Sequence, residues 1–236
     1  MRDEFFRLVG HELRSPLTAV QLQVDALAMS ARQGATADAI EARADRVRRS
    51  AYRLAWIVDE MVDLGRAVGS RLSLHPEAAD LVVLARRVLD RFADELGRAG
   101  CAARVAADAP VMGRWDVARV EHAIGSLLLA AKRSGAGQPI ELEVSGAASD
   151  TPSACLSVRD RGPGLPAAEY ALVFLSFDGL LDALPPGSPV LSLWLVRAVA
   201  ETHGGRLSLA PGLADLELPK TGDAGAGLIA GGSGPP

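Results

Sequence analysis

The stretch from Phe5 to Thr18 reads Phe-Phe-Arg-Leu-Val-Gly-His-Glu-Leu-Arg-Ser-Pro-Leu-Thr and decides how the first part of the chain folds. Apolar residues within it and after it recur at steps of three and four residues, which is the spacing of one face of an α-helix. The members of this apolar stripe are Phe6, Val9, Leu13, Leu17, Val20, Val24 and Leu27. Residues 2–31 are therefore expected to form one long amphipathic helix.

A histidine is expected on the opposite side of this helix. His11 is two residues from Val9 and two from Leu13, and at about 100° per residue this spacing turns it away from the stripe. Glu12 follows it directly. Pro16 falls inside the helix, where a proline removes a backbone hydrogen bond and costs about 3 kcal/mol. A solvent-facing histidine beside a carboxylate, in a helix that tolerates a proline, indicates chemistry at His11 rather than packing.

The composition is that of an ordinary globular protein. The 236 residues are 49% hydrophobic and 23% charged, with a formal net charge of −4, which gives no support for nucleic-acid binding. No apolar stretch approaches the roughly 20 residues of a membrane span, and the N-terminus does not read as a signal peptide, so a cytoplasmic protein is expected. Cys101 and Cys155 are expected to be free thiols in strands. The few His and Cys residues show no metal-ligand spacing, so no metal site is predicted from them.

A second helix is expected after Gly34, with Thr36 as its N-cap. Its apolar residues repeat at roughly 3.5 positions, as in a coiled coil. They are Ile40, Val47, Ala51, Leu54, Ile57, Met61, Leu64 and Val68. Two antiparallel helices with narrow apolar seams cannot bury those seams alone, whereas two copies can, as a four-helix bundle. A homodimer formed by a first domain over residues 1–69 is therefore expected.

The pattern changes to mixed α and β in a second domain expected over residues 70–219. The expected strands are residues 72–74, 101–107, 140–144, 154–158, 206–209 and 213–218, and the expected helices are residues 81–99, 115–133 and 191–202. The segment 162–189 is expected to be irregular. Residues 220–236 are rich in glycine and are expected to be a disordered tail.

Residues 160–165 read Asp-Arg-Gly-Pro-Gly-Leu and follow one of the predicted strands. An acid at the end of a strand can accept a hydrogen bond from the exocyclic amine of a ligand. Two glycines allow the backbone to turn sharply and a ligand to approach it closely. Asp160, Gly162 and Gly164 are therefore candidate ligand-binding residues, although a tight turn alone can use the same pattern.

Residues 11–18 resemble the H-box of two-component sensor histidine kinases, His-Glu-Leu-Arg-Thr-Pro-Leu-Thr, with Ser15 in place of the first Thr. Residues 160–165 resemble the first glycine box of the ATP-binding domain of that family, the Bergerat (GHKL) fold. Residues 173–177 resemble its phenylalanine box, and residues 201–205 the usual end of the following helix. The resemblance implies an antiparallel helical hairpin that forms a dimeric four-helix bundle, followed by an α/β sandwich.

The resemblance also implies roles for the H-box residues. His11 would carry a phosphoryl group, and Glu12 would act as its base or orient its ring. Ser15 takes the position from which family members orient a hydrolytic water. The implied partner is the receiver domain of a response regulator, whose Asp exchanges phosphoryl with His11.

At the adenine end of the implied nucleotide site the family pattern is kept, because Asp160 matches the residue that holds the adenine amino group. The asparagine box, Asn-Leu-Leu-x-Asn-Ala-x-Lys-Tyr in the family, is altered over residues 126–134. Ala130 replaces the Asn that coordinates magnesium, and a methyl group cannot ligate a hard cation. Ser134 replaces an aromatic residue near the base, and Arg133 keeps the positive charge of the usual Lys.

The phosphate end departs further. The second glycine box, Gly-x-Gly-Leu-Gly-Leu in the family, aligns with residues 187–193, which read Gly-Ser-Pro-Val-Leu-Ser-Leu. Val190 and Ser192 replace the glycines that cradle phosphates beside a helix N-terminus. ATP and magnesium are thus the cofactors that the resemblance implies, and weak or absent binding of both is expected.

Three hypotheses for function follow from the sequence. The first is a dimeric phosphotransfer or phosphatase module in which His11 exchanges phosphoryl with a receiver Asp. The second is an ATP-dependent histidine kinase that phosphorylates His11; the parts that phosphoryl transfer from ATP requires are those that differ here. The third is a non-catalytic protein that binds a response regulator, which would not require His, Glu, Ser and Pro together in the H-box.

Overall fold

The computed structural model of the chain describes residues 2–69, 72–135, 137–146, 151–184 and 188–221. It divides into two compact units, Met1–Arg66 and Ala67–Pro236. Each unit is considered by itself below.

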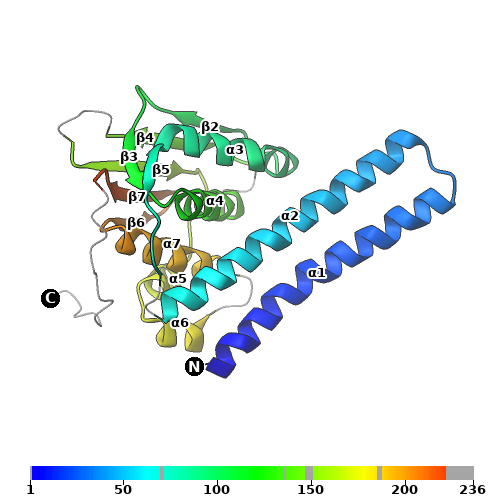
Figure 1. Ribbon diagram of the computed structural model, residues 1–236, viewed down its shortest axis with the longest axis horizontal. Helices are drawn as coiled ribbons and strands as arrows, with labels where there is room; N and C mark the ends of the chain where they lie inside the picture. The colour runs from blue at the N-terminus through cyan, green and yellow to red at the C-terminus, as the bar shows by residue number, and fades with distance from the viewer. Residues whose placement is uncertain (1, 70–71, 136, 147–150, 185–187, 222–236) are drawn as a thin grey trace. The chain divides into compact units, whose positions relative to one another are not determined.

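The first unit is a helical hairpin made of α1 (Arg2–Arg32) and α2 (Ala37–Val68), which run antiparallel (Figure 1). At the turn between them Gly34 has a positive φ of 70°, a conformation that favours glycine. Thr36 then accepts a hydrogen bond from the backbone N–H of Ala39 at 3.3 Å through its Oγ1 atom. The expected long first helix and the expected Thr36 cap are both confirmed.

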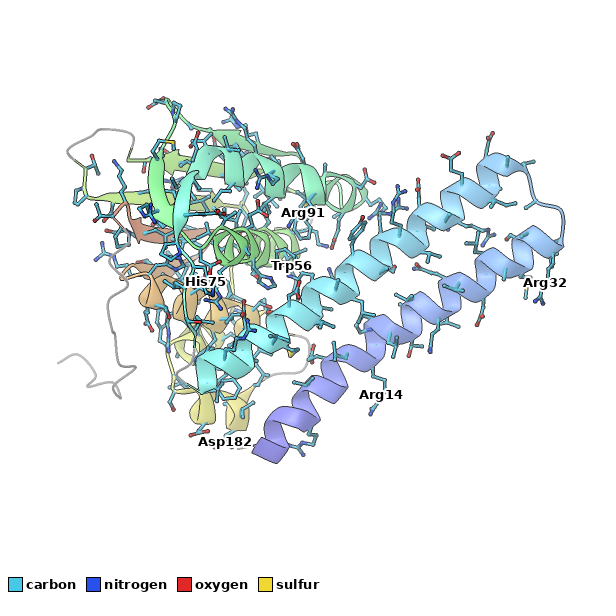
Figure 2. All side chains as sticks on the ribbon, in the orientation of Figure 1. Arg14, Arg32, Trp56, His75, Arg91 and Asp182 are labelled. Atoms are coloured by element: carbon cyan, nitrogen blue, oxygen red, sulfur yellow. The ribbon has the colours of Figure 1, made fainter. Side chains whose placement is uncertain are left out.

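Much of the apolar surface of the hairpin is exposed in the single chain. Leu17 and Val24, two members of the α1 stripe, are 46% and 45% exposed. Charged side chains such as Arg14 and Arg32 project outward from the same helix (Figure 2). An amphipathic helix gains most of its stability by burying its apolar face, so the hairpin presents a seam that is suited to pack against a further surface.

The second unit contains a five-stranded sheet covered on one face by helices (Figure 1). The strand order is β2-β4-β5-β7-β6, with β2 parallel to β4 and the other neighbours antiparallel. The strands are β2 (Ala103–Ala106), β4 (Ile140–Ser145), β5 (Ser153–Arg159), β6 (Arg206–Ala210) and β7 (Leu213–Pro219). A separate two-stranded ribbon pairs β1 (Glu77–Asp80) with β3 (Met112–Trp115).

Three long helices form the layer over the sheet, with α4 between α3 and α7. They are α3 (Leu81–Arg98), α4 (Val117–Ser134) and α7 (Val190–Thr202). Alternate residues of β5, namely Ala154, Leu156 and Val158, point into this layer and are buried. The two-layer α/β sandwich that the sequence predicted is therefore confirmed.

A buried junction joins the N-terminus of α4 to the C-terminus of α7. Asp116 caps α4 by accepting the N–H of Arg119 at 3.2 Å, and its other carboxylate oxygen accepts the N–H of His75 at 3.1 Å. The N–H of Asp116 donates to Nε2 of His203 at 3.1 Å, while Nδ1 of His203 lies 2.8 Å from the carbonyl oxygen of Val199. The His203 ring is therefore neutral, with its proton on Nδ1. Burial lowers the pKa of His203 below its usual 6.5, against the raising effect of the Val199 carbonyl.

Several expectations for this unit are wrong. Residues 72–74 form no strand, and the first strand of the unit is β1 at residues 77–80. Trp115 ends the unpredicted strand β3 instead of starting a helix, because its indole is fully buried and donates to the carbonyl of Pro219 at 2.7 Å. Cys101 lies just before β2 and is a free, buried thiol, and Cys155 is a free thiol within β5 as expected.

The segment predicted to be irregular contains two short helices, α5 (Ala167–Val173) and α6 (Phe177–Ala183). Each begins at a recognisable start signal, since Pro166 precedes α5 and Ser176 caps α6 by accepting the N–H of Gly179 at 3.4 Å. Helices of two turns are too short to show an apolar period. Of the predicted disordered tail, residues 222–236 lie outside the described part of the chain.

Candidate functional site

The H-box residues lie on α1, whose helical backbone continues through Pro16. The side chain of His11 is outside the part that the structure describes, so its orientation stays a prediction. Glu12 is half-buried and Ser15 is exposed. Ser15 is one helical turn after His11, and residues four apart in a helix share a face.

The structure brings the three residues of the glycine turn together with Ser134 at the end of α4. The Oδ1 atom of Asp160 accepts a hydrogen bond from the N–H of Gly162 at 2.7 Å and lies 3.4 Å from Oγ of Ser134. The same Ser134 oxygen accepts the N–H of Gly164 at 2.8 Å. The hydroxyl that replaces an aromatic side chain of the family thus ties the turn to α4 and occupies one oxygen of Asp160.

Both glycines of the turn are required by close approach of other atoms. A Cβ at Gly162 would lie 2.4 Å from the carbonyl oxygen of Ser134. Gly164 has a φ of +74°, and a Cβ there would lie 2.7 Å from the hydroxyl oxygen of Tyr170. Asp160, Gly162 and Gly164 lie in one turn, as their sequence pattern predicted, whereas no sequence pattern predicted that Tyr170 of α5 lies against this turn.

Asp160 lines two pockets, a larger one of about 630 Å³ beside β2 and β4 and a smaller one at the end of α4. The volume of the smaller pocket is about 40 Å³, and its lining includes Ala130, Ser134, Tyr170 and Leu193 together with residues of the β6–β7 turn. Pockets that bury drug-sized ligands are about 300–1,000 Å³. Arg133, a predicted binding residue, is exposed and is not among the residues that line the smaller pocket.

The start of α7, where the family pattern places a phosphate cradle, is occupied by side chains of the chain itself. Pro189 precedes the helix and has no N–H to offer, and Val190 is fully buried. Ser188 accepts the N–H of Val190 at 3.3 Å and donates its hydroxyl proton to a carboxylate oxygen of Glu169. Glu169 was not predicted as a site residue. Its sequence shows only an acidic residue in the first turn of α5.

The residues at this site differ from those that the family pattern assigns to magnesium and the phosphates of ATP. Ala130 lines the pocket where the family has its metal-ligating amide, and the described residues include no group of three or more His, Cys, Asp or Glu side chains that could hold a metal ion. The helix start that would meet the phosphates already holds a carboxylate. The turn at the adenine end is intact, and one carboxylate oxygen of its Asp160 bonds within the chain.

The segment with α5 and α6 is anchored on α7 by three contacts. Arg197 donates to the carbonyl of Val173 at 2.9 Å, and Trp194 donates to the carbonyl of Leu175 at 3.0 Å. The rings of Trp194 and Phe177 have centroids 5.2 Å apart. These contacts hold α5, and with it Glu169 and Tyr170, over the candidate site.

A helical hairpin followed by an α/β sandwich with an Asp-x-Gly-x-Gly turn at the end of β5 defines a phosphoacceptor hairpin joined to a GHKL-type domain. Residues 1–69 match the family model described as the His Kinase A (phospho-acceptor) domain. Residues 115–227 match the model described as the histidine kinase-, DNA gyrase B- and HSP90-like ATPase. The chain belongs to the two-component sensor histidine kinases, as the H-box and the glycine turn predicted.

Curated relatives extend the similarity over most of the chain. It is 33% identical over 221 residues to the signal transduction histidine-protein kinase/phosphatase MprB of Mycobacterium tuberculosis, which covers 88% of this chain and 41% of MprB. The MprB of Mycobacterium avium is 33% identical over 216 residues, covering 87% of this chain and 40% of that protein. The chain therefore spans about two fifths of the length of these relatives. Across the described part of the chain, no helix is both long and apolar enough to cross a membrane.

Solved structures share the fold. The Acinetobacter baumannii histidine kinase AdeS matches with a TM-score of 0.59 at 20% identity, over 89% of this chain and 98% of that one. Histidine kinase ThkA, solved in complex with the response regulator protein TrrA, matches with a TM-score of 0.56 at 18% identity, over 93% of this chain and 62% of that one.

Proposed function

We propose that this histidine kinase family member acts as a dimeric phosphotransfer module. His11 exchanges a phosphoryl group with the Asp of a response-regulator receiver domain, and the second unit binds ATP weakly or not at all. The observation that supports the second half of the proposal is that one carboxylate oxygen of Asp160 bonds to Gly162 and Ser134, beside the smaller of its two pockets, of about 40 Å³.

The chemistry at His11 requires no nucleotide. A neutral imidazole nitrogen attacks the phosphorus of an aspartyl phosphate, the P–O bond to the carboxylate breaks, and the Asp leaves as a carboxylate. Imidazole is largely neutral at pH 7 and so is available as a nucleophile. Glu12 accepts the N–H of the other ring nitrogen and stabilises the positive charge that develops on the ring. Ser15 orients a water for hydrolysis of the receiver phosphate.

The exposed seam of the hairpin supports a homodimer through α1 and α2. In a single chain Leu17, Val24 and Met29 remain exposed, and pairing two hairpins as a four-helix bundle removes such surfaces from water. Burial of apolar surface contributes about 25 cal/mol per Å². The bundle would present one His11 on each of its α1 helices to a receiver domain.

Incubation with a receiver domain carrying a radiolabelled phosphoryl group tests the transfer. We expect label to appear on the wild-type chain and not on His11→Ala, with the dimer intact because His11 is predicted to lie off the apolar stripe. Ser15→Ala should still accept label but should release inorganic phosphate from the receiver about 10- to 100-fold more slowly, the range in which a positioned group contributes to proton transfer. Equal labelling of His11→Ala would contradict the proposal.

An ordinary ATP-dependent kinase is the second candidate, and the intact Asp160-Gly162-Gly164 turn favours it. Calorimetry with Mg·ATP separates the two. Each missing charge-assisted contact forgoes about 1.5–3 kcal/mol, so losing two of them weakens a micromolar site to about millimolar. Micromolar affinity for Mg·ATP with label from ATP accumulating on His11 would establish the kinase instead.

A further inference from the structure

Two consecutive residues of α5 reach the two ends of the altered nucleotide site. Tyr170 lines the pocket beside Asp160, with its hydroxyl close to Gly164. Glu169, the residue before it, bonds to Ser188 at the start of α7. Because α7 packs against α5 and anchors it through Arg197, both side chains are held by the fold rather than placed by a flexible loop.

The place that Glu169 occupies is electrostatically suited to an anion. The N-terminus of a helix carries a partial positive charge and unpaired N–H groups, which is why phosphates bind there. In this chain the Ser188 hydroxyl accepts a hydrogen bond from the N–H of Val190 and donates one to Glu169, so a single hydroxyl links the carboxylate to the start of the helix. A phosphate that entered would meet a fixed negative charge.

We propose that Glu169 is the residue that excludes nucleotide phosphates from this site, acting as a built-in carboxylate at the start of α7, while Tyr170 restricts the adenine end. The inference rests on the proposed function, since it explains why binding is weak. The two residues act at different ends of the site. Glu169 repels the negative charge of the phosphates, and Tyr170 reduces the volume that is open to the base.

The test is a titration of the isotopically labelled whole chain, followed by NMR, with Mg·ATP and with adenosine as separate probes. Glu169→Gln keeps the shape and a polar contact to Ser188 but removes the charge. Tyr170→Ala removes the ring. Asp182→Asn is the matched control, because it removes one exposed acid from the neighbouring helix α6 without touching the start of α7.

We expect Glu169→Gln to bind Mg·ATP about fivefold more tightly than the wild type, the size of effect that one charge at a helix terminus produces, with adenosine unchanged. Tyr170→Ala should increase the affinity for Mg·ATP and the affinity for adenosine by equal factors. Asp182→Asn should change neither affinity.

Weak Mg·ATP binding by both the wild type and Glu169→Gln would overturn the role of Glu169 and leave the proposed function standing. An equal gain in affinity for ATP and for adenosine in Glu169→Gln would also overturn this role of Glu169. Such a gain would come from a more open site and not from the lost charge. Micromolar Mg·ATP binding by the wild type would overturn the proposed function and remove the basis of the inference.

Discussion

At the scale of single residues, several polar side chains of the candidate site bond to partners within the chain. Ser134 bonds Asp160 and Gly164, and Glu169 bonds Ser188. A hydrogen bond within a protein contributes about 0.5–1.5 kcal/mol to its stability. Bonds of this kind therefore stabilise both ends of the site.

His203 makes the stability of the fold depend on pH. Its pKa is lowered by burial from 6.5, so below that pH the unfolded chain binds a proton that the folded chain does not. The free energy of unfolding should be constant above pH 6.5 and should fall by up to about 1.4 kcal/mol per pH unit below it.

Urea unfolding at pH 7.5, 6.5 and 5.5, roughly spanning the reference pKa of histidine, measures this dependence. His203→Gln should be less stable at every pH and should lose the extra slope below pH 6.5. His75→Gln, at an exposed position, should keep the slope of the wild type. An unchanged slope in His203→Gln would assign the pH dependence to other groups.

At the scale of elements, long periodic helices and alternating strands were predictable and short elements were not. The bounds of α1, α3, α7 and β4 agree with expectation to within about two residues, because each has an apolar period or a cap. Strands β1 and β3 are only four residues long, and they pair through contacts distant in sequence that no local pattern encodes. The helices α5 and α6 were missed because two turns are too short to show an apolar period.

The candidate site was predictable in the same uneven way. Its glycine turn could be selected because Asp and Gly in that order carry a local backbone requirement. Tyr170 and Glu169 could not, because their importance comes from tertiary contacts with Gly164 and Ser188. The altered residues Ala130 and Val190 were recognisable only against the pattern of the family.

Asp116, the N-cap of α4, is expected to contribute to the stability of the fold. Asp116 satisfies the N–H groups of Arg119 and His75, and it is buried. Asp116→Ala should lower the free energy of unfolding by about 2–3 kcal/mol, because the cap is lost and buried donors are left without their acceptor. Asp182→Ala, at an exposed position in α6, should change it by less than about 0.5 kcal/mol in denaturant titration. Equal effects of the two substitutions would contradict this role for Asp116.

At the scale of the whole molecule, the two units differ in how far they bury their apolar residues. The second unit buries a continuous core beneath α3, α4 and α7, including Leu128, Leu142 and Leu156. The hairpin leaves apolar residues exposed along both helices, among them Leu22 and Val62. We therefore expect association through the first unit rather than through the second.

Light scattering at micromolar concentration should give about twice the mass of one chain. Val24→Glu places a charge in the seam and should shift the protein toward the monomer, since a charge at a buried interface costs several kcal/mol. Arg32→Glu, near the hairpin turn on an outward-projecting side chain, is the matched control and should leave the mass unchanged (Figure 2). A wild-type chain that is monomeric under these conditions would contradict the bundle.

The contacts that anchor α5 and α6 on α7 include Trp194, which can serve as an intrinsic fluorescence probe of this anchoring. Trp194 donates to the carbonyl of Leu175 and contacts the ring of Phe177. The guanidinium carbon of Arg197 lies over the Trp194 ring, 5.6 Å from the ring centroid. Lifting the segment would place this indole in water and move its fluorescence emission to longer wavelength. Trp115, sealed against Pro219 in another part of the unit, would change its emission only when the whole domain unfolds. Local opening would therefore shift the contribution of Trp194 alone, whereas global denaturation would shift that of Trp115 as well.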